Sequence, residues 1–292
     1  MTQPASPKLA TGPSERRRAT AAFVLIGCLL AAGCATHHIA TGVVIATTPP
    51  TSVTISHDPF PGYMDAMTMP FELSGEARNV RLIPGDRVQF RLTVGKQRSV
   101  VDRIEVVSAT PADAGLERSP AMPALVAVGS AVPDFGLVDQ RGAALTLSSL
   151  RGKVVAVTFI YTRCPLPDYC PRMIENFRAV RTRFATAMDH ELVLLTVSFD
   201  PQYDTPQRLA AYAAANRALT PGWFFLTGDA TQIERVCEAF GIQYYAEEGL
   251  ITHSLQTAVI GRDGRLAATV EGRAFTPRQL GDLIESALAG GR

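Results

Sequence analysis

The chain has 292 residues, of which 28 are basic and 27 acidic, so its formal net charge is +1. This balance gives no electrostatic reason to expect a nucleic-acid partner. Five cysteines are too few for a scaffold built from disulfides. The length suits about two ordinary domains.

The N-terminus has the pattern of an export signal. Arg16–Arg18 form a basic segment, Ala19–Ala32 an uncharged apolar stretch, and small residues precede Cys34. This resembles a bacterial lipoprotein signal, in which the cysteine is lipidated and becomes the mature N-terminus. We predict residues 1–33 as the signal and Cys34 as the lipidation site. Lipidation of Cys28, an ordinary signal peptide and an uncleaved anchor are the alternatives, although a membrane span needs about 20 apolar residues. Each of them exports the protein, and we expect a membrane-anchored periplasmic lipoprotein of the cell envelope.

Residues 40–108 are rich in short alternating segments without a helical period. Proline and glycine pairs mark the turns between these segments. The pattern favours a small, closed, OB-like β-barrel. The predicted strands are Thr41–Ala46, Ser52–His57, Met67–Leu73, Arg87–Val94 and Val100–Val107.

Residues 109–127 contain several prolines and alanines, and we predict that they form a linker. The following region, 128–290, alternates apolar runs with helical periodicity in the order βαβαβαββα, which predicts an α/β domain with helices on both sheet faces. The expected central strands are Lys153–Ile160 and Leu192–Ser198. The expected helices are Cys170–Phe184, a helix ending at Asn216 that Asp204 or Thr205 caps, Thr231–Phe240 and Pro277–Leu288.

Two cysteines flank the turn between the first central strand and its helix. Cys164 follows the strand and Cys170 begins the helix. A helix N-terminus lowers the pKa of a nearby thiol and favours the thiolate. A pair of thiolates can exchange a disulfide or hold a soft metal. A structural disulfide or buried free cysteines are the alternatives.

Segments on both sides of this pair resemble the Sco/SenC family of thioredoxin-like copper proteins. They are Pro133-Asp-Phe, Leu150-Arg-Gly-Lys-Val-Val, Phe159-Ile-Tyr-Thr-Arg-Cys-Pro, Cys170-Pro, Ser198-Phe-Asp-Pro and Thr252-His-Ser. The resemblance implies a thioredoxin-like fold and copper ligation by Cys164, Cys170 and His253. It also implies that the two cysteines form a redox-active pair and that Asp200 has a supporting role.

Two details of the sequence bear on this resemblance. Five residues separate Cys164 from Cys170, whereas the family spacing is usually three. No proline lies at 252–256, where thiol reductases of the thioredoxin type carry a cis-proline. The second detail favours metal binding over dithiol exchange.

The barrel region carries a second group of soft ligands. Met67 and Met69 are two residues apart on a strand, so their thioethers project from one face. Thioethers suit Cu(I) or Ag(I), although methionines also fill cores. His57 followed by Met67-Thr-Met-Pro-Phe resembles the CusF type of copper-binding β-barrel, which implies His57, Met67 and Met69 as ligands. Met64 stands where that module has a metal-capping tryptophan, and it is a candidate fourth ligand.

Together the two resemblances imply a copper metallochaperone rather than an enzyme. The expected partner is the copper-bearing subunit of cytochrome c oxidase or another copper acceptor, and the expected task is to deliver copper, or reducing equivalents, to the dinuclear copper site. Two metal sites on one chain suggest copper transfer from the barrel to the second domain. The alternatives are a thiol–disulfide oxidoreductase of the envelope, and copper or silver tolerance by sequestration.

Overall fold

The structure, a computed structural model, describes residues 36–48, 50–95, 98–107, 125–247 and 250–290. Met1–Cys34 and Ala35–Arg292 are separate units, and every described residue lies in the second. No helix in these described ranges is both long and apolar enough to cross a bilayer. The predicted signal, Cys28, Cys34 and most of the predicted linker lie outside the described residues.

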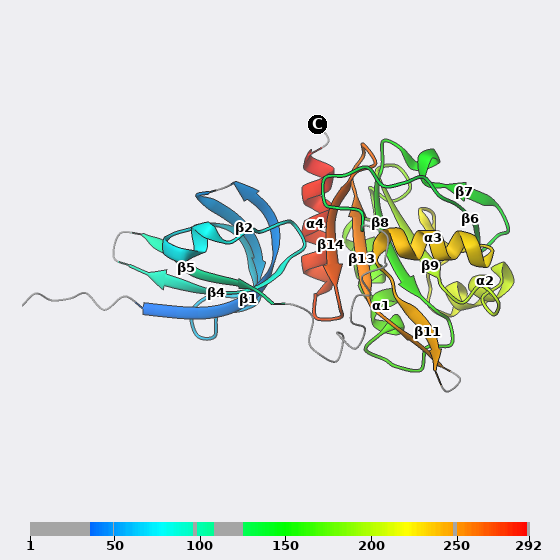
Figure 1. Ribbon diagram of the computed structural model, residues 1–292, viewed down its shortest axis with the longest axis horizontal. Helices are drawn as coiled ribbons and strands as arrows, with labels where there is room; N and C mark the ends of the chain where they lie inside the picture. The colour runs from blue at the N-terminus through cyan, green and yellow to red at the C-terminus, as the bar shows by residue number, and fades with distance from the viewer. Residues whose placement is uncertain (1–35, 49, 96–97, 108–124, 248–249, 291–292) are drawn as a thin grey trace, which may run out of the picture. The chain divides into compact units, whose positions relative to one another are not determined.

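The first part of the chain is all-β, as the alternating segments predict (Figure 1). One antiparallel sheet has the strand order β3-β2-β1-β4-β5. A bridge from Leu73 to Val101 brings the end of β3 against β5, so the two edges of the sheet meet. The strands are β1 (Thr36–Thr48), β2 (Ser52–His57), β3 (Met67–Glu72), β4 (Arg87–Val94) and β5 (Ser99–Val106), with a short 3₁₀ helix at Gly75–Asn79.

Strand β1 buries side chains on both of its faces. Val44 belongs to the hydrophobic core inside the first sheet. Its neighbours Val43 and Ile45 point the other way, because side chains alternate along a strand. Both are nevertheless buried, in the apolar cluster of the second half of the chain. The outer face of the sheet is therefore covered here.

The second part of the chain is α/β, as predicted (Figure 1). Its mixed sheet has the order β14-β13-β8-β9-β10-β6-β7, and the central strands β8, β9 and β10 are parallel. Every residue of β8 and β9 is buried, as their continuous apolar runs predict. The strands are β6 (Gly136–Asp139), β7 (Ala144–Thr146), β8 (Val154–Ile160), β9 (Leu192–Ser198), β10 (Trp223–Thr227), β13 (Gln256–Ile260) and β14 (Leu266–Glu271).

The predicted helices form close to their expected bounds. They are α1 (Cys170–Arg183), α2 (Pro206–Ala215), α3 (Ala230–Phe240) and α4 (Pro277–Gly290), with a short 3₁₀ helix at Leu147–Leu150. Thr205 is the N-cap of α2: its side chain accepts a hydrogen bond from the Arg208 N–H, and Pro206 follows in the first turn. Helices α1 and α4 pack against each other.

One element is absent from the sequence prediction. Strands β11 (Tyr244–Glu247) and β12 (Leu250–His253) form a separate antiparallel hairpin, with Tyr244 opposite His253. No residue of the hairpin is fully buried. Its sequence therefore lacks the apolar alternation by which strands are recognised. This hairpin positions His253.

Candidate metal centres

A buried carboxylate anchors the turn that follows strand β8. Asp204 is fully buried and accepts a hydrogen bond of 3.0 Å from the backbone N–H of Thr162. Its carboxylate also accepts hydrogen bonds from the hydroxyls of Thr162 and Ser198. A buried charge needs such partners to offset its desolvation. Sequence reasoning treated Asp204 only as a candidate helix cap, and its Asp-Thr-Pro segment was the one available signal.

Asp200 supports the same turn from the other side. One oxygen of its carboxylate accepts two hydrogen bonds from the Arg163 guanidinium, at 2.6 and 3.0 Å. Arg163 immediately precedes Cys164, and its guanidinium also lies over the ring of Tyr203. The predicted supporting residue therefore contacts the neighbour of a cysteine.

The structure brings together the three residues that the Sco/SenC resemblance implies. The donor atoms of Cys164, Cys170 and His253 all lie within 4.8 Å of one another. The Cys170 Sγ and the His253 Nε2 are 3.7 Å apart. Cys170 is fully buried, whereas Cys164 and His253 are half-buried, so the cluster is open on one side. Both cysteines are free thiols.

The ring of His253 is oriented by its own backbone and by aromatic neighbours. Its Nδ1 lies 2.9 Å from the carbonyl oxygen of Ser254. A carbonyl oxygen only accepts, so Nδ1 carries the proton and the Nε2 lone pair faces the thiols. The rings of Tyr161, Tyr169 and Phe199 surround the imidazole, with Phe199 nearest at a centroid distance of 4.8 Å.

The dimensions of this cluster suit one metal ion. Metal–sulfur and metal–imidazole bonds are roughly 2.0–2.3 Å long for zinc, so three donors around one ion stand about 3.5–4 Å apart. Donor atoms within 4.8 Å of one another need to move closer by about 1 Å or less. The two prolines of the five-residue turn, Pro165 and Pro167, do not prevent this convergence. Thiolate and imidazole donors favour copper or zinc over hard cations.

The pKa values of the two thiols are shifted in opposite directions. A hydrogen bond from the Cys170 thiol lowers the pKa of Cys164 to about 4. Burial raises the pKa of Cys170 well above its ordinary value. The expectation that the helix N-terminus would favour the thiolate is therefore wrong for Cys170, because desolvation outweighs the helix dipole there. Cys164 is therefore the thiolate of the pair, and Cys170 keeps its proton.

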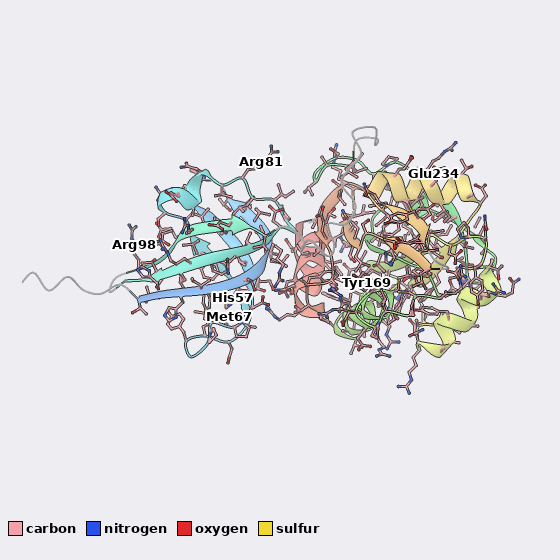
Figure 2. The ribbon with its side chains drawn as sticks, turned by 60° about the horizontal axis from the view of Figure 1, so that its bottom comes forward. His57, Met67, Arg81, Arg98, Tyr169 and Glu234 are labelled. Atoms are coloured by element: carbon pink, nitrogen blue, oxygen red, sulfur yellow. The ribbon has the colours of Figure 1, made fainter. Side chains whose placement is uncertain are left out.

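The β2–β3 pair carries the three predicted ligands of the barrel, and Figure 2 shows two of them, His57 and Met67, near each other. His57 is paired directly with Met67, and Ile55 with Met69. Residues directly opposite in an antiparallel pair share a face, and so do residues two apart. His57 and Met69 follow this rule and face the barrel core, where the His57 ring contacts those of Phe60 and Phe71. Met67, at the start of β3, instead lines a pocket with Arg278 and Asp282.

His57 carries the feature that fits this group to a metal. Its Nδ1 lies 2.8 Å from the carbonyl oxygen of Asp58, so Nδ1 carries the proton. Its Nε2 is buried and has no hydrogen-bond partner among the described residues. Burial lowers the pKa of His57 and keeps the imidazole neutral. A buried, unpaired lone pair costs free energy unless something binds it.

Met64 lies at the edge of the same region. It is half-buried, packs against the barrel core and forms a bridge with Phe60, whose ring is 4.9 Å from that of His57. Met69 is half-buried as well, whereas Met67 is 46% exposed. The barrel group is therefore accessible through Met67. Cys237, by contrast, is a buried thiol in α3 that does not belong to the cluster of Cys164, Cys170 and His253, as a small hydrophobe would be.

Comparison with protein families assigns both regions. The SCO1/SenC family model matches residues 127–289, which are 163 of the 292 residues. The model of the copper-binding periplasmic protein CusF matches residues 37–106. Copper is the metal that these families bind, and the cluster of Cys164, Cys170 and His253 lies within the SCO1/SenC match.

Individual relatives match the second region. A Stutzerimonas stutzeri protein whose description names copper binding is 32% identical over 141 residues, which are 47% of this chain and 67% of that protein. The mitochondrial SCO2 homologue of Homo sapiens is 27% identical over 163 residues, 53% of this chain and 59% of its own length. This chain thus spans about two thirds or less of these curated relatives.

A solved structure shows the same fold. A SCO1/SenC family lipoprotein from Bacillus anthracis is 23% identical, with a TM-score of 0.50, over 58% of this chain and 100% of its own. Copper-bound ScoI from Arabidopsis thaliana is also 23% identical, with a TM-score of 0.47, over 54% and 98%. With more than half of its length in the family match, the chain belongs to the SCO1/SenC family and carries a CusF domain in front of it.

Proposed function

We propose that this protein is a copper metallochaperone of the cell envelope that delivers copper to the dinuclear copper site of cytochrome c oxidase. The observation that carries the proposal is the convergence of Cys164, Cys170 and His253 within 4.8 Å. These residues come from a turn, a helix start and a separate hairpin, and together they supply two sulfurs and an imidazole nitrogen. The family membership supports copper as the cargo.

The geometry suits hand-over rather than permanent storage. Three donors leave a coordination position for a ligand from the acceptor, so copper can pass through a shared intermediate. Cys164 is half-buried and Cys170 is fully buried. The acceptor therefore meets the side of the site that Cys164 and His253 expose, while Cys170 holds the copper from within.

The barrel is the second copper site of the proposal, with His57, Met67 and Met69 as ligands and Met64 as a candidate fourth. Thioethers need no deprotonation and form no disulfides, so this site holds copper in an oxidising compartment. We propose that copper captured by the barrel passes to Cys164, Cys170 and His253. A copper-loaded barrel mixed with an apo second domain tests this step, and no movement of copper at any ratio would refute it.

The proposed place of action is the periplasmic face of a membrane, with Cys34 as the lipid anchor. The support is the sequence pattern of residues 1–33 and the CusF match, whose description is periplasmic. Mass spectrometry of the membrane-extracted protein tests the anchor: a lipidated Cys34 at the N-terminus is expected, and an unmodified Cys34 would refute it.

Metal analysis of the purified, reduced protein tests the main site. The barrel is first silenced with His57→Gln and Met69→Leu, and Cys28 and Cys34 are replaced by serine, so that only the second site is measured. Cys164→Ser and His253→Ala should then each abolish stoichiometric copper binding. Cys237→Ala removes a buried thiol outside the site and is the matched control, which should bind copper normally. Full copper retention by Cys164→Ser or His253→Ala would refute the assignment.

One observation favours a second function, thiol–disulfide exchange. The low pKa of Cys164 makes it a thiolate at neutral pH, and the Cys170 sulfur lies within 4.8 Å. An oxidoreductase would keep its exchange activity in His253→Ala, whereas a chaperone loses copper in that variant. Sequestration for metal tolerance, the remaining alternative, predicts normal oxidase activity and copper sensitivity in a deletion strain.

A further inference from the structure

Helix α4 is buried in a way that its own domain does not explain. Six consecutive residues, 279–284, are buried. At about 3.6 residues a turn, six consecutive positions point in every direction around the axis. Leu280, Leu283 and Ile284 belong to the apolar cluster of the second region. Gln279 and Asp282 are polar and face something else.

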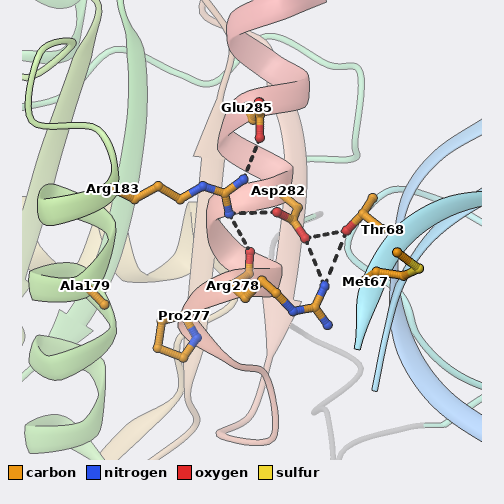
Figure 3. Close-up of a pocket in the computed structure, with 8 residues that line it drawn as sticks. All are labelled: Met67, Thr68, Ala179, Arg183, Pro277, Arg278, Asp282 and Glu285. Carbon is orange, nitrogen blue, oxygen red and sulfur yellow. Dashed lines mark hydrogen bonds and ion pairs between the residues drawn. The ribbon is translucent and has the colours of Figure 1, made fainter. Parts of the chain in front are cut away.

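What they face is the outer side of the β2–β3 pair (Figure 3). Asp282 accepts hydrogen bonds of 2.5 Å from the hydroxyls of Ser56 and Thr68. Gln279 is fully buried and donates to the Ser56 carbonyl oxygen and to the Asp58 carboxylate, both at 3.1 Å.

Two arginines complete the charge balance of this network. Arg183 of α1 lies 2.7 Å from the second oxygen of Asp282. Arg278 of α4 donates to the His57 carbonyl oxygen at 2.6 Å and to the Ser56 hydroxyl at 2.8 Å. Asp282 is only 8% exposed, so the arginines offset the burial of its charge. This is a built interface rather than a surface contact.

Every barrel residue that hydrogen-bonds to Arg278, Gln279 or Asp282 either is a proposed metal ligand or lies next to one in the sequence. Ser56 and Asp58 flank His57, Arg278 binds the carbonyl of His57 itself, and Thr68 stands between Met67 and Met69. Strand alternation accounts for most of this arrangement, because His57 and Met69 face the barrel core while Ser56 and its partner Thr68 point outward. Met67, at the start of β3, lines the outer pocket beside Arg278 and Asp282 (Figure 3). The network thus fixes the backbone from which the ligands project.

We propose that helix α4 is the outer support of the barrel's metal site, with Arg278, Gln279 and Asp282 as positioning residues for His57, Met67 and Met69. The inference rests on the proposed copper site of the barrel. The SCO1/SenC domain thus supports a metal site to which it contributes no ligand.

The support acts on affinity through preorganisation. A metal site whose ligands are held in place before binding loses less conformational entropy when the metal arrives. Loss of groups that orient metal ligands typically costs about 10–100-fold in affinity. By thermodynamic reciprocity, metal in the barrel must strengthen the contact with α4 by the same factor.

The test uses the whole chain in a cysteine-free background, with Cys28, Cys34, Cys164 and Cys170 replaced by serine and Cys237 by alanine, so that added Ag(I) reports on the barrel alone. Asp282→Ala should weaken Ag(I) binding, measured by competition with a chelator, by about 10–100-fold. Thr68→Val keeps the side-chain volume and removes one hydrogen bond to Asp282, so it should weaken binding less. Glu285→Gln is the matched control: Glu285 is exposed, contacts Arg183, and should leave affinity unchanged.

Hydrogen exchange supplies an independent readout. In the same cysteine-free background with no other substitution, Ag(I) should slow amide exchange in β2, β3 and the first turns of α4. In Asp282→Ala the slowing should vanish from α4. Thr68→Val keeps the test valid if Asp282→Ala does not fold.

Two outcomes separate this inference from the proposed function. If His57→Gln binds Ag(I) as tightly as the background protein, the barrel site itself is wrong. The support by α4 is refuted by a different result. In that result His57→Gln loses the metal, while folded Asp282→Ala and Thr68→Val both bind Ag(I) within about twofold of the background protein. The loss expected on removing an orienting group is about 10–100-fold.

Discussion

Replacement of Asp204 by alanine is predicted to destabilise the SCO1/SenC domain strongly. The change leaves the Thr162 N–H, the Thr162 hydroxyl and the Ser198 hydroxyl without their acceptor. Each orphaned buried donor costs roughly 1–3 kcal/mol, and the two hydroxyls can partly reorient, so we expect a loss of about 3–4 kcal/mol. Thr162 also starts the turn to Cys164, so copper affinity should fall with stability.

Trp223 makes the assay specific to one domain. It is the chain's single tryptophan, it is fully buried in β10, and its indole N–H bonds to Thr196. Urea unfolding followed by its fluorescence therefore reports on the SCO1/SenC domain. With a urea dependence of about 2 kcal/mol per molar, the midpoint should fall by about 1.5–2 M.

Asp200→Ala is the matched control for this prediction. Its carboxylate pairs with Arg163, whose side chain is 43% exposed and returns to water when the partner is lost. A pair of this kind contributes about 1 kcal/mol or less, so the midpoint should move by no more than about 0.5 M. If Asp204→Ala shifted the midpoint no further than Asp200→Ala, the anchoring role of Asp204 would be disproved.

Three further predictions concern the barrel, the thiol pair and the packing of a turn. Met69→Leu conserves volume and should leave the unfolding free energy within about 1.5 kcal/mol, while the barrel's Ag(I) affinity falls at least tenfold in chelator competition; unchanged affinity would exclude the thioether as a ligand. Cys164, with a pKa of about 4, should react with iodoacetamide at a rate that is flat from pH 8 to about 5 and falls as the pH drops through 4, because protonation removes the thiolate. A mass-spectrometric rate that instead rises tenfold per pH unit between 6 and 8 would indicate an ordinary thiol. Gly85→Ala should destabilise the protein more than Gly142→Ala in denaturant unfolding: both glycines have positive φ, but a Cβ at Gly85 would lie 2.1 Å from the Thr269 carbonyl oxygen, whereas nothing lies within 4 Å at Gly142. Equal losses would mean that the Gly85 turn is not packed against β14.

The spacing of the barrel's candidate ligands was the most predictable part of the sites. His57, Met67 and Met69 lie on paired strands, and strand alternation predicts the two methionines on one face. The register that sets His57 opposite Met67 came from the structure. So did the unpaired Nε2 of His57, because burial depends on every segment that surrounds a residue.

The second cluster needed the resemblance to find its third member. Cys164 and Cys170 are close in sequence, and their position at a strand–helix turn was read correctly. His253 lies 83 residues beyond Cys170, on a hairpin that shows no alternating pattern. Periodicity could not have found this strand, since its residues are not fully buried.

The sequence by itself determined the two-part architecture, the central strands, the helices and the chemical types of the ligands. These depend on local periodicity, capping residues and spacing, which act between neighbours along the chain. Only the tertiary structure decided which thiol is the thiolate, that Asp204 anchors the cysteine turn, and that α4 contacts the residues beside the barrel's ligands. Proton affinity and the pairing of buried polar groups depend on contacts between segments far apart in sequence, and no local pattern records those contacts.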